Sequence, residues 1–329
     1  MRISWSYVLA LIAFLFIPAD STETKPYADF IHVRIDGKPL HDILNSVLDT
    51  WDFKLPESGL RKGTGYIGAN FRARRVVRDM LSGKRPVKIA VIGGTVSAAQ
   101  HGVSKRGETD WVSLIGSWIS KAFKGHNITV ANHAVAGSTS AKTAPCVVSM
   151  LDPEVDMVFS EFVYDDGFES QILQNSRTRG YELLIRQLLM LPGRPAVIMM
   201  QTMVPGAAAE DKHPGKKAFH ITQEDVYGAL SQYYDVQWLS FRDATYRLAQ
   251  HRPTPGLGYQ DLMDPSPLHS LPSDAGHKVL ADLAVWFMQQ TAVDLALRPY
   301  DHTDVEQSSE PVPPSMFPKN TLHESVTCS

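Results

Sequence analysis

From residue 87 onward, short apolar segments alternate with segments of helical periodicity for about two hundred residues. The apolar segments expected to be strands are 87–92, 128–135, 155–162, 196–201 and 236–241. Because parallel strands need a long crossover, usually a helix, this alternation favours a parallel sheet with helices on both faces. The sequence therefore predicts an α/β fold, a three-layer α/β/α sandwich around a five-stranded parallel sheet.

Capping residues and apolar spacing place the connecting helices. Asp110 can cap a helix whose apolar residues recur every three or four positions, namely Trp111, Leu114, Ile115, Trp118, Ile119 and Phe123. Further helices are expected at 181–191, 224–234 and 242–250, and Ser273 can cap a final one.

A chain of 329 residues that is 43% apolar and 20% charged can bury one large core. We expect four parts: a signal peptide at 1–21, an N-terminal extension at 22–86, the α/β domain at 87–297, and a disordered or extended proline-rich tail at 298–329. The extension includes a basic helical segment whose arginines we expect to face solvent, namely Arg72, Arg74, Arg75 and Arg78.

The first residues have the pattern of a secretory signal. Arg2 precedes a run of about ten apolar residues, which Pro18 and small residues follow. That run is shorter than the roughly 20 residues that span a bilayer. We expect a secreted protein with no membrane contact after cleavage, and an uncleaved signal anchor is the alternative. The glycosylation sequon Asn127-Ile128-Thr129 agrees with secretion.

Charge and cysteine usage exclude several classes of partner. The net charge is −3 and no basic block stands out, so nucleic acid is not an expected partner. Cys146 and Cys328 have neither metal-ligand nor redox spacing, and whether they form a disulfide depends on a proximity that the sequence does not show. Metal-ligand spacing is also missing among His101, His126, His133, His213 and His220, so we expect no metal and no cofactor.

Gly93-Gly94-Thr95 ends the first predicted strand, where a hydroxyl would lie at the carboxyl edge of the sheet. The two glycines let the backbone turn tightly and come close to a bound group. Three further segments follow in order: 132–140 with Gly137 after the second strand, 161–167 with Asp165 after the third, and 264–277 before the final helix.

The order and spacing of these four segments, over roughly residues 64–292, resemble the SGNH (GDSL-like) hydrolase superfamily. The likeness is greatest to secreted SGNH-type esterases whose first segment begins with Gly-Gly-Ser. The resemblance implies the flavodoxin-like SGNH hydrolase fold and hydrolysis of an ester through an acyl-enzyme. In that family a serine attacks the carbonyl, backbone and asparagine N–H groups form the oxyanion hole, and a histidine oriented by an aspartate is the base.

Carried over to this sequence, the resemblance makes Thr95 the nucleophile and places Thr95 N–H, Gly137 and Asp165 at the oxyanion hole. Threonine has the same oxygen as serine, but its methyl group restricts χ1 and crowds the approach to a carbonyl. Asp165 stands where the family has asparagine. An ionised carboxylate only accepts hydrogen bonds, so a donor role requires protonation, which burial beside Asp166 would favour.

The segment before the final helix leaves the base open. The family has a histidine directly before Pro-Ser-Asp, and Leu271 holds that position here. His269 is the first candidate base, with Asp264 as the carboxylate that orients it. His277 has an Asp-x-x-His spacing with Asp274, although we interpret Asp274 as part of a helix start. The third possibility is that no base functions.

The expected function is therefore hydrolysis of a small-molecule or carbohydrate ester outside the cell, by Thr95, His269 and Asp264. The altered positions support a second hypothesis, a catalytically inactive protein of this fold that binds a glycan or another ligand at the former active site. Ser97 and Glu161 are expected to have structural roles. The sequence does not determine the oligomeric state.

Overall fold

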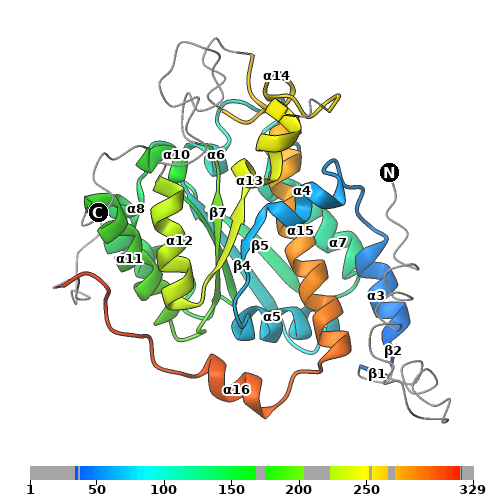
Figure 1. Ribbon diagram of the computed structural model, residues 1–329. Coiled ribbons are helices and arrows are strands. Elements are labelled where there is room, and N and C mark those ends of the chain that lie inside the picture. Colours follow the sequence, from blue (N-terminus) through cyan, green and yellow to red (C-terminus); the bar gives the residue numbers. More distant parts are fainter. Residues whose placement is uncertain are drawn as a thin grey trace, which may run out of the picture.

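A six-stranded sheet forms the centre of the molecule, between two layers of helices (Figure 1). The computed structural model describes residues 34–35, 38–167, 175–203, 223–251, 254–265, 271–318 and 320. The strand order is β3-β8-β7-β6-β4-β5. The strands are β3 (Thr64–Tyr66), β4 (Val87–Gly93), β5 (Ile128–Asn132), β6 (Met157–Glu161), β7 (Ala196–Gln201) and β8 (Gln237–Ser240). A separate two-stranded ladder joins β1 (Arg34–Ile35) to β2 (Lys38–Pro39).

The five predicted strands are confirmed, and they are mutually parallel. The sixth strand, β3, differs from the prediction: it pairs antiparallel with β8 at one edge of the sheet. Its sequence is Thr-Gly-Tyr, which is too short to display the two-residue alternation that marks a strand.

Parallel strands covered on both faces are apolar on both faces, which accounts for the continuous apolar run of β4. Ile89 and Val91 face one core, and Ala90 and Ile92 face the other. The first core includes residues of α3 (Leu40–Leu48), α4 (Glu57–Lys62), α5 (Phe71–Ser82), α7 (Trp111–Ala122), α13 (Phe241–Tyr246), α14 (Tyr259–Leu262) and α15 (Asp274–Leu297). The second includes residues of η1 (Ala144–Cys146), α9 (Val147–Met150), α11 (Ser176–Leu189) and α12 (Gln223–Tyr234).

The predicted helix caps are present. The side chain of Asp110 accepts from Ser113 N–H at the start of α7, and Ser273 accepts from Gly276 N–H at the start of α15. Each cap satisfies a backbone donor that would otherwise lack an intrahelical partner. A single turn of π-helix (Arg247–His251) continues α13.

The basic segment is indeed a helix, α5, but the expectation that all its arginines face solvent is wrong. Arg74 is fully buried and pairs with Asp304 at 2.7 Å and with Asp294. Arg72 and Arg75 donate to backbone carbonyls, among them that of Gly193 at 2.8 Å from Arg75. Arg74 lies where α15 and α16 pack against α5, and its buried guanidinium group therefore requires charged partners.

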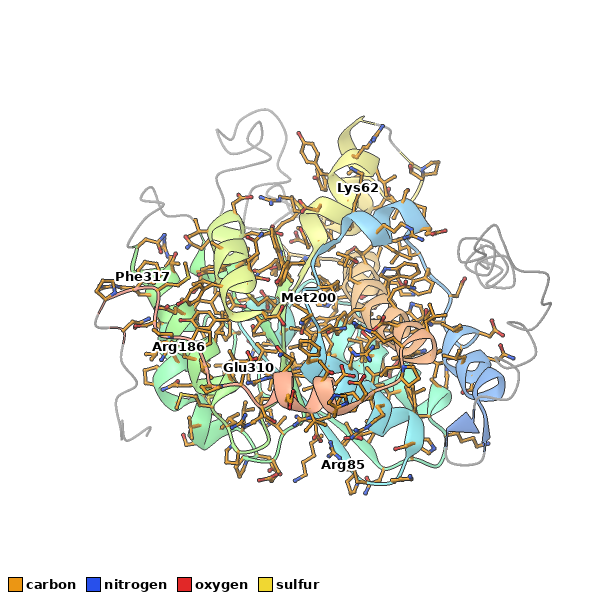
Figure 2. All side chains as sticks on the ribbon, turned by 60° about the horizontal axis from the view of Figure 1, so that its bottom comes forward. Lys62, Arg85, Arg186, Met200, Glu310 and Phe317 are labelled. Carbon is orange, nitrogen blue, oxygen red and sulfur yellow. The ribbon has the colours of Figure 1, made fainter. Side chains whose placement is uncertain are left out.

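The chain after Arg298 is helical at α16 (His302–Ser308) and extended beyond it. Arg186 donates to Pro313 O, and Phe317 packs against the second core. Figure 2 shows Arg186 and Phe317 on the same side of the molecule, and Met200 in its interior. Cys328 lies outside the described residues, as does the predicted signal at 1–21. Within the part that the structure describes, none of the helices is both long and apolar enough to cross a membrane.

Candidate active site

The Gly-Gly turn after β4 brings Thr95 to the carboxyl end of the sheet, between β5 and β6 in the strand order. Thr95 begins the short helix α6 (Thr95–Ala98). A Cβ on Gly93 would lie 2.7 Å from Glu161 O, and one on Gly94 would lie 1.9 Å from Asp165 Oδ2. Glycine is therefore required at both positions because other parts of the chain pass so close. Figure 1 shows α6 and α10 (Val163–Asp166) at the end of the sheet opposite α16.

The structure brings together three of the residues predicted from the sequence: Thr95, Gly137 and Asp165. Thr95 N–H donates to Asp165 Oδ2 at 2.6 Å, and Thr95 Oγ1–H donates to Asp165 Oδ1 at 2.7 Å. Gly137 N–H donates to Thr95 Oγ1 at 3.0 Å. Gly137 has a φ of +75°, which other residues adopt only under strain. Both Thr95 and Asp165 are partly exposed.

Asp165 acts as an acceptor in this arrangement. Its two carboxylate oxygens take the two donors of Thr95, one from the backbone and one from the hydroxyl. The predicted donation by Asp165 to an oxyanion therefore requires a protonated carboxyl group, and it stays a prediction.

Behind Thr95, a buried network built on Glu161 fixes α6. Ser97 donates to Glu161 Oε2 from its N–H at 3.1 Å and from its hydroxyl at 3.0 Å, and Thr202 donates to Oε1 at 3.1 Å. Burial, and secondarily the charge of Asp165, raises the pKa of Glu161 to about 7. These bonds give Ser97 and Glu161 the structural role expected of them.

Asp166 anchors the neighbouring loop. It accepts from Ser140 N–H at 3.0 Å and from Tyr227 O–H at 2.6 Å. Ser140 is the first residue of α8 (Ser140–Thr143), which follows the loop that carries Gly137. Burial raises the pKa of Asp166 to about 6. The carboxylate thus ties α10 to the loop from which Gly137 approaches Thr95.

His269 lies outside the described residues, and the structure does not test its predicted role. Asp264 is described: its Oδ1 accepts from Leu271 N–H at 3.1 Å, and its own N–H donates to Leu271 O at 2.7 Å. These bonds, with the bridge between Met263 and Pro272, join the two ends of the segment that carries His269.

His277, the second candidate base, has a structural position. Its Nδ1 accepts from Trp111 N–H at 3.2 Å at the start of α7, and the side chain is buried. Burial lowers the pKa of His277 to about 4, so the ring is neutral near pH 7. No group of three or more acidic, histidine or cysteine side chains within the described ranges is placed to hold a metal ion.

The sequence contains one signal for the Thr95–Asp165 contact, the paired glycines, which were interpreted above as room for a bound group. Paired glycines directly before Thr95 indicate that another group comes within contact distance of that turn. The identity of that group, a carboxylate from the segment after β6, depends on the course of α10 and could not be derived from spacing.

No family model matches the sequence, and no curated protein matches it either. Among solved structures, the chain is similar to a two-domain esterase active on acetylated mannans, co-crystallised with mannopentaose. That match has a TM-score of 0.62 at 19% identity and covers 82% of this chain and 62% of the other. A second crystal structure of a two-domain esterase active on acetylated mannans has a TM-score of 0.62 at 20% identity, over 80% of this chain and 62% of the other. A putative GDSL-like lipase from Parabacteroides merdae has a TM-score of 0.47 at 12% identity, over 64% of this chain and 97% of the other.

The two matches with a TM-score of 0.62 show that the chain shares the α/β fold of these esterases, and the predicted α/β fold is confirmed. The chain spans 62% of the length of the two-domain esterases. At such low sequence identity the likeness concerns the fold, and activity depends on the site itself.

Proposed function

We propose that this protein is a carboxylic ester hydrolase in which Thr95 Oγ1 is the nucleophile. The observation that carries the proposal is the set of contacts of that oxygen: it donates to Asp165 at 2.7 Å and accepts from Gly137 N–H at 3.0 Å. A hydroxyl is a weak nucleophile until a neighbouring group accepts its proton, and a carboxylate already accepts this one. The product of attack would be an acyl group esterified to Thr95.

Two backbone donors are available to stabilise the negative charge that forms on the carbonyl oxygen. They are the N–H groups of Thr95 and Gly137. In the structure these donate to Asp165 Oδ2 and to Thr95 Oγ1, and they would exchange these partners for the oxyanion. Fixed donors of this kind typically contribute a few kcal/mol to transition-state stabilisation. His269, with Asp264 to orient it, is the base that the sequence suggests.

An acylated carbohydrate is the substrate class we propose. The support is that an esterase active on acetylated mannans has this fold over 82% of the chain. Secretion, which the apolar N-terminal segment suggests, would give the enzyme access to such polymers, and the sequon residue Asn127 is exposed as glycosylation requires.

The test is hydrolysis of 4-nitrophenyl acetate and of acetylated mannan by the unmodified protein and by Thr95→Ala. We expect release of acetate from both substrates, and a fall in kcat/KM for Thr95→Ala to the rate of a buffer blank. Thr95→Ser keeps the oxygen and removes the methyl group, so it should match or exceed the unmodified protein. Equal rates for the unmodified protein and Thr95→Ala would refute the proposal.

A second candidate function is binding without catalysis, and one observation favours it. Thr95 N–H, which would serve an oxyanion, is instead bonded to Asp165 at 2.6 Å. If neither the unmodified protein nor Thr95→Ser hydrolyses the two substrates, titration calorimetry with acetylated mannan oligosaccharides is the measurement that supports or excludes this candidate.

A further inference from the structure

We infer that Asp165 is the group that takes the proton of Thr95 during acyl transfer, so that a carboxylate performs the step usually given to an imidazole. This inference rests on the proposed ester hydrolysis. In the SGNH hydrolases that the sequence resembles, the residue at this position donates a hydrogen bond to the oxyanion. Here Asp165 would instead accept a proton from the nucleophile.

The contact between the two side chains is already that of a nucleophile and its base. Thr95 Oγ1 and Asp165 Oδ1 are 2.7 Å apart, within the range expected for proton transfer. The second contact, from Thr95 N–H to Asp165 Oδ2 at 2.6 Å, fixes the carboxylate so that Oδ1 stays on the hydroxyl. Gly137 N–H also donates to Oγ1, at 3.0 Å.

The surroundings hold Asp165 in place. A Cβ on Gly94 would meet Asp165 Oδ2 at 1.9 Å, so this glycine gives the carboxylate the room it needs. The next residue, Asp166, accepts hydrogen bonds from Ser140 and Tyr227, and these bonds fix α10. Buried Glu161 lies behind, where its bonds to Ser97 hold the helix that Thr95 begins.

A carboxylate beside an oxyanion would ordinarily be unfavourable, because the two negative charges repel each other. The charge balance of this step avoids that repulsion. The proton moves from Thr95 Oγ1 to Asp165 Oδ1 while Oγ1 forms a bond to the ester carbon and the carbonyl π electrons move to its oxygen. Asp165 loses its charge as the oxyanion gains one, so the two negative charges do not coexist. Neutral Asp165 is then a weaker acceptor, and Thr95 N–H is released to bind the oxyanion together with Gly137 N–H.

Asp165 transfers one proton in each half of the reaction. When the tetrahedral intermediate collapses, the bond to the alcohol oxygen breaks and that oxygen takes the proton from Asp165 Oδ1, which leaves an acyl group on Thr95. Asp165 next accepts a proton from water as the water oxygen attacks the acyl carbon. When this second tetrahedral intermediate collapses, the bond between Oγ1 and the acyl carbon breaks, the carboxylic acid leaves, and Asp165 gives the proton it took from water to Thr95 Oγ1.

Asp165→Asn distinguishes this role from that of an oxyanion donor, because the two roles predict opposite results. An amide can donate to an oxyanion but cannot take the hydroxyl proton, so we expect kcat/KM for 4-nitrophenyl acetate to fall at least about 100-fold. Asp165→Glu keeps the carboxylate but displaces it, and should retain more activity than Asp165→Asn. The control is Asp152→Asn, which removes an exposed carboxylate paired with Lys88 and should leave the rate unchanged. Unfolding in urea verifies that each variant is folded.

Activity of Asp165→Asn at or above that of the unmodified protein would overturn the inference, and loss of activity in His269→Gln would then assign the base to His269. In that case ester hydrolysis by Thr95 stands. Equal activity of the unmodified protein and Thr95→Ala would instead overturn the proposed function, and the inference with it.

Discussion

At the scale of the residue, the chemistry of this site depends on how closely Asp165 approaches Thr95. The approach is possible because the preceding residue has no side chain: a Cβ on Gly94 would lie 1.9 Å from Asp165 Oδ2 and 2.6 Å from its Cγ. The same Cβ would lie 2.8 Å from the backbone oxygen of Ser138. Contacts below 3 Å force a displacement, and the carboxylate, at the end of a side chain, moves more readily than the backbone.

We therefore predict that Gly94→Ala separates Asp165 from Thr95 and lowers kcat/KM for 4-nitrophenyl acetate by roughly 100-fold, as expected for loss of a base. Gly116→Ala is the matched control. Gly116 lies within α7, and a Cβ there meets nothing within 4 Å. This substitution should leave the rate unchanged and stabilise the protein by up to about 1 kcal/mol. Full activity in Gly94→Ala would show that the contact has no part in catalysis.

That Thr95, Gly137 and Asp165 lie together could be predicted from the sequence, but not how they contact each other. Thr95, Gly137 and Asp165 each follow a strand of a parallel sheet, and such strands share a carboxyl edge. The direction of the Thr95–Asp165 hydrogen bonds depends on side-chain geometry, about which spacing carries no information. The approach of Gly137 N–H to Thr95 depends in the same way on a loop conformation with positive φ.

At the scale of the element, α5 and α16 are joined by a buried ion pair. Arg74 is fully buried, and the side chain of Asp304 is 5% exposed. Asp301 and Asp304 also form the capping box at the start of α16. Removal of one partner from a buried pair typically costs about 3–5 kcal/mol. Arg74 keeps its ion pair with the 43% exposed Asp294, so the low end of that range is expected for loss of Asp304.

We predict that Asp304→Asn lowers the free energy of unfolding by about 3 kcal/mol, measured by urea denaturation. The control is Glu57→Gln, which removes the partner of Arg61 in an exposed pair on α4. That change should cost less than about 1 kcal/mol, because solvent screens such a pair. Equal effects of the two substitutions would contradict the role assigned to Arg74.

The strands and helices that could be predicted from the sequence were those in which apolar residues form a continuous run or recur at regular spacing over many residues. The five parallel strands, α7 and α15 belong to this group. β3 has three residues and α16 has seven, so neither presents a repeated apolar face. The burial of Arg74 could not be predicted for a related reason. A charged residue is normally expected at the surface, and its ion-pair partner, Asp304, is 230 residues away in the sequence.

At the scale of the whole molecule, several carboxyl groups are buried with raised pKa values. Burial raises the pKa to about 7 for Glu161, to about 8 for Glu224 and to about 6 for Asp166. In each case the folded state favours the protonated form more than the unfolded state does. The stability that each contributes is therefore complete at low pH and is lost as the pH rises through the folded-state pKa.

Glu161→Gln tests this linkage, because glutamine imitates the protonated acid. The Glu161 contribution should be complete below pH 4.5 and lost by about pH 7, with a total on the order of 3 kcal/mol. The free energy of unfolding, measured in urea at pH 5 and pH 8, should therefore fall less with pH in Glu161→Gln than in the unmodified protein. An identical change in the two proteins would show that Glu161 does not titrate as assigned.

The proposed function requires that an acyl group becomes bonded to Thr95, and trapping of this acyl-enzyme tests it most directly. The protein would be mixed with excess 4-nitrophenyl acetate, quenched in acid and digested, and its peptides examined by mass spectrometry. We predict one acetyl group on Thr95, absent from Thr95→Ala and accumulating further in Asp165→Glu if deacylation is slowed. Hydrolysis that proceeds without acetylation of Thr95, or equally in Thr95→Ala, would contradict the account.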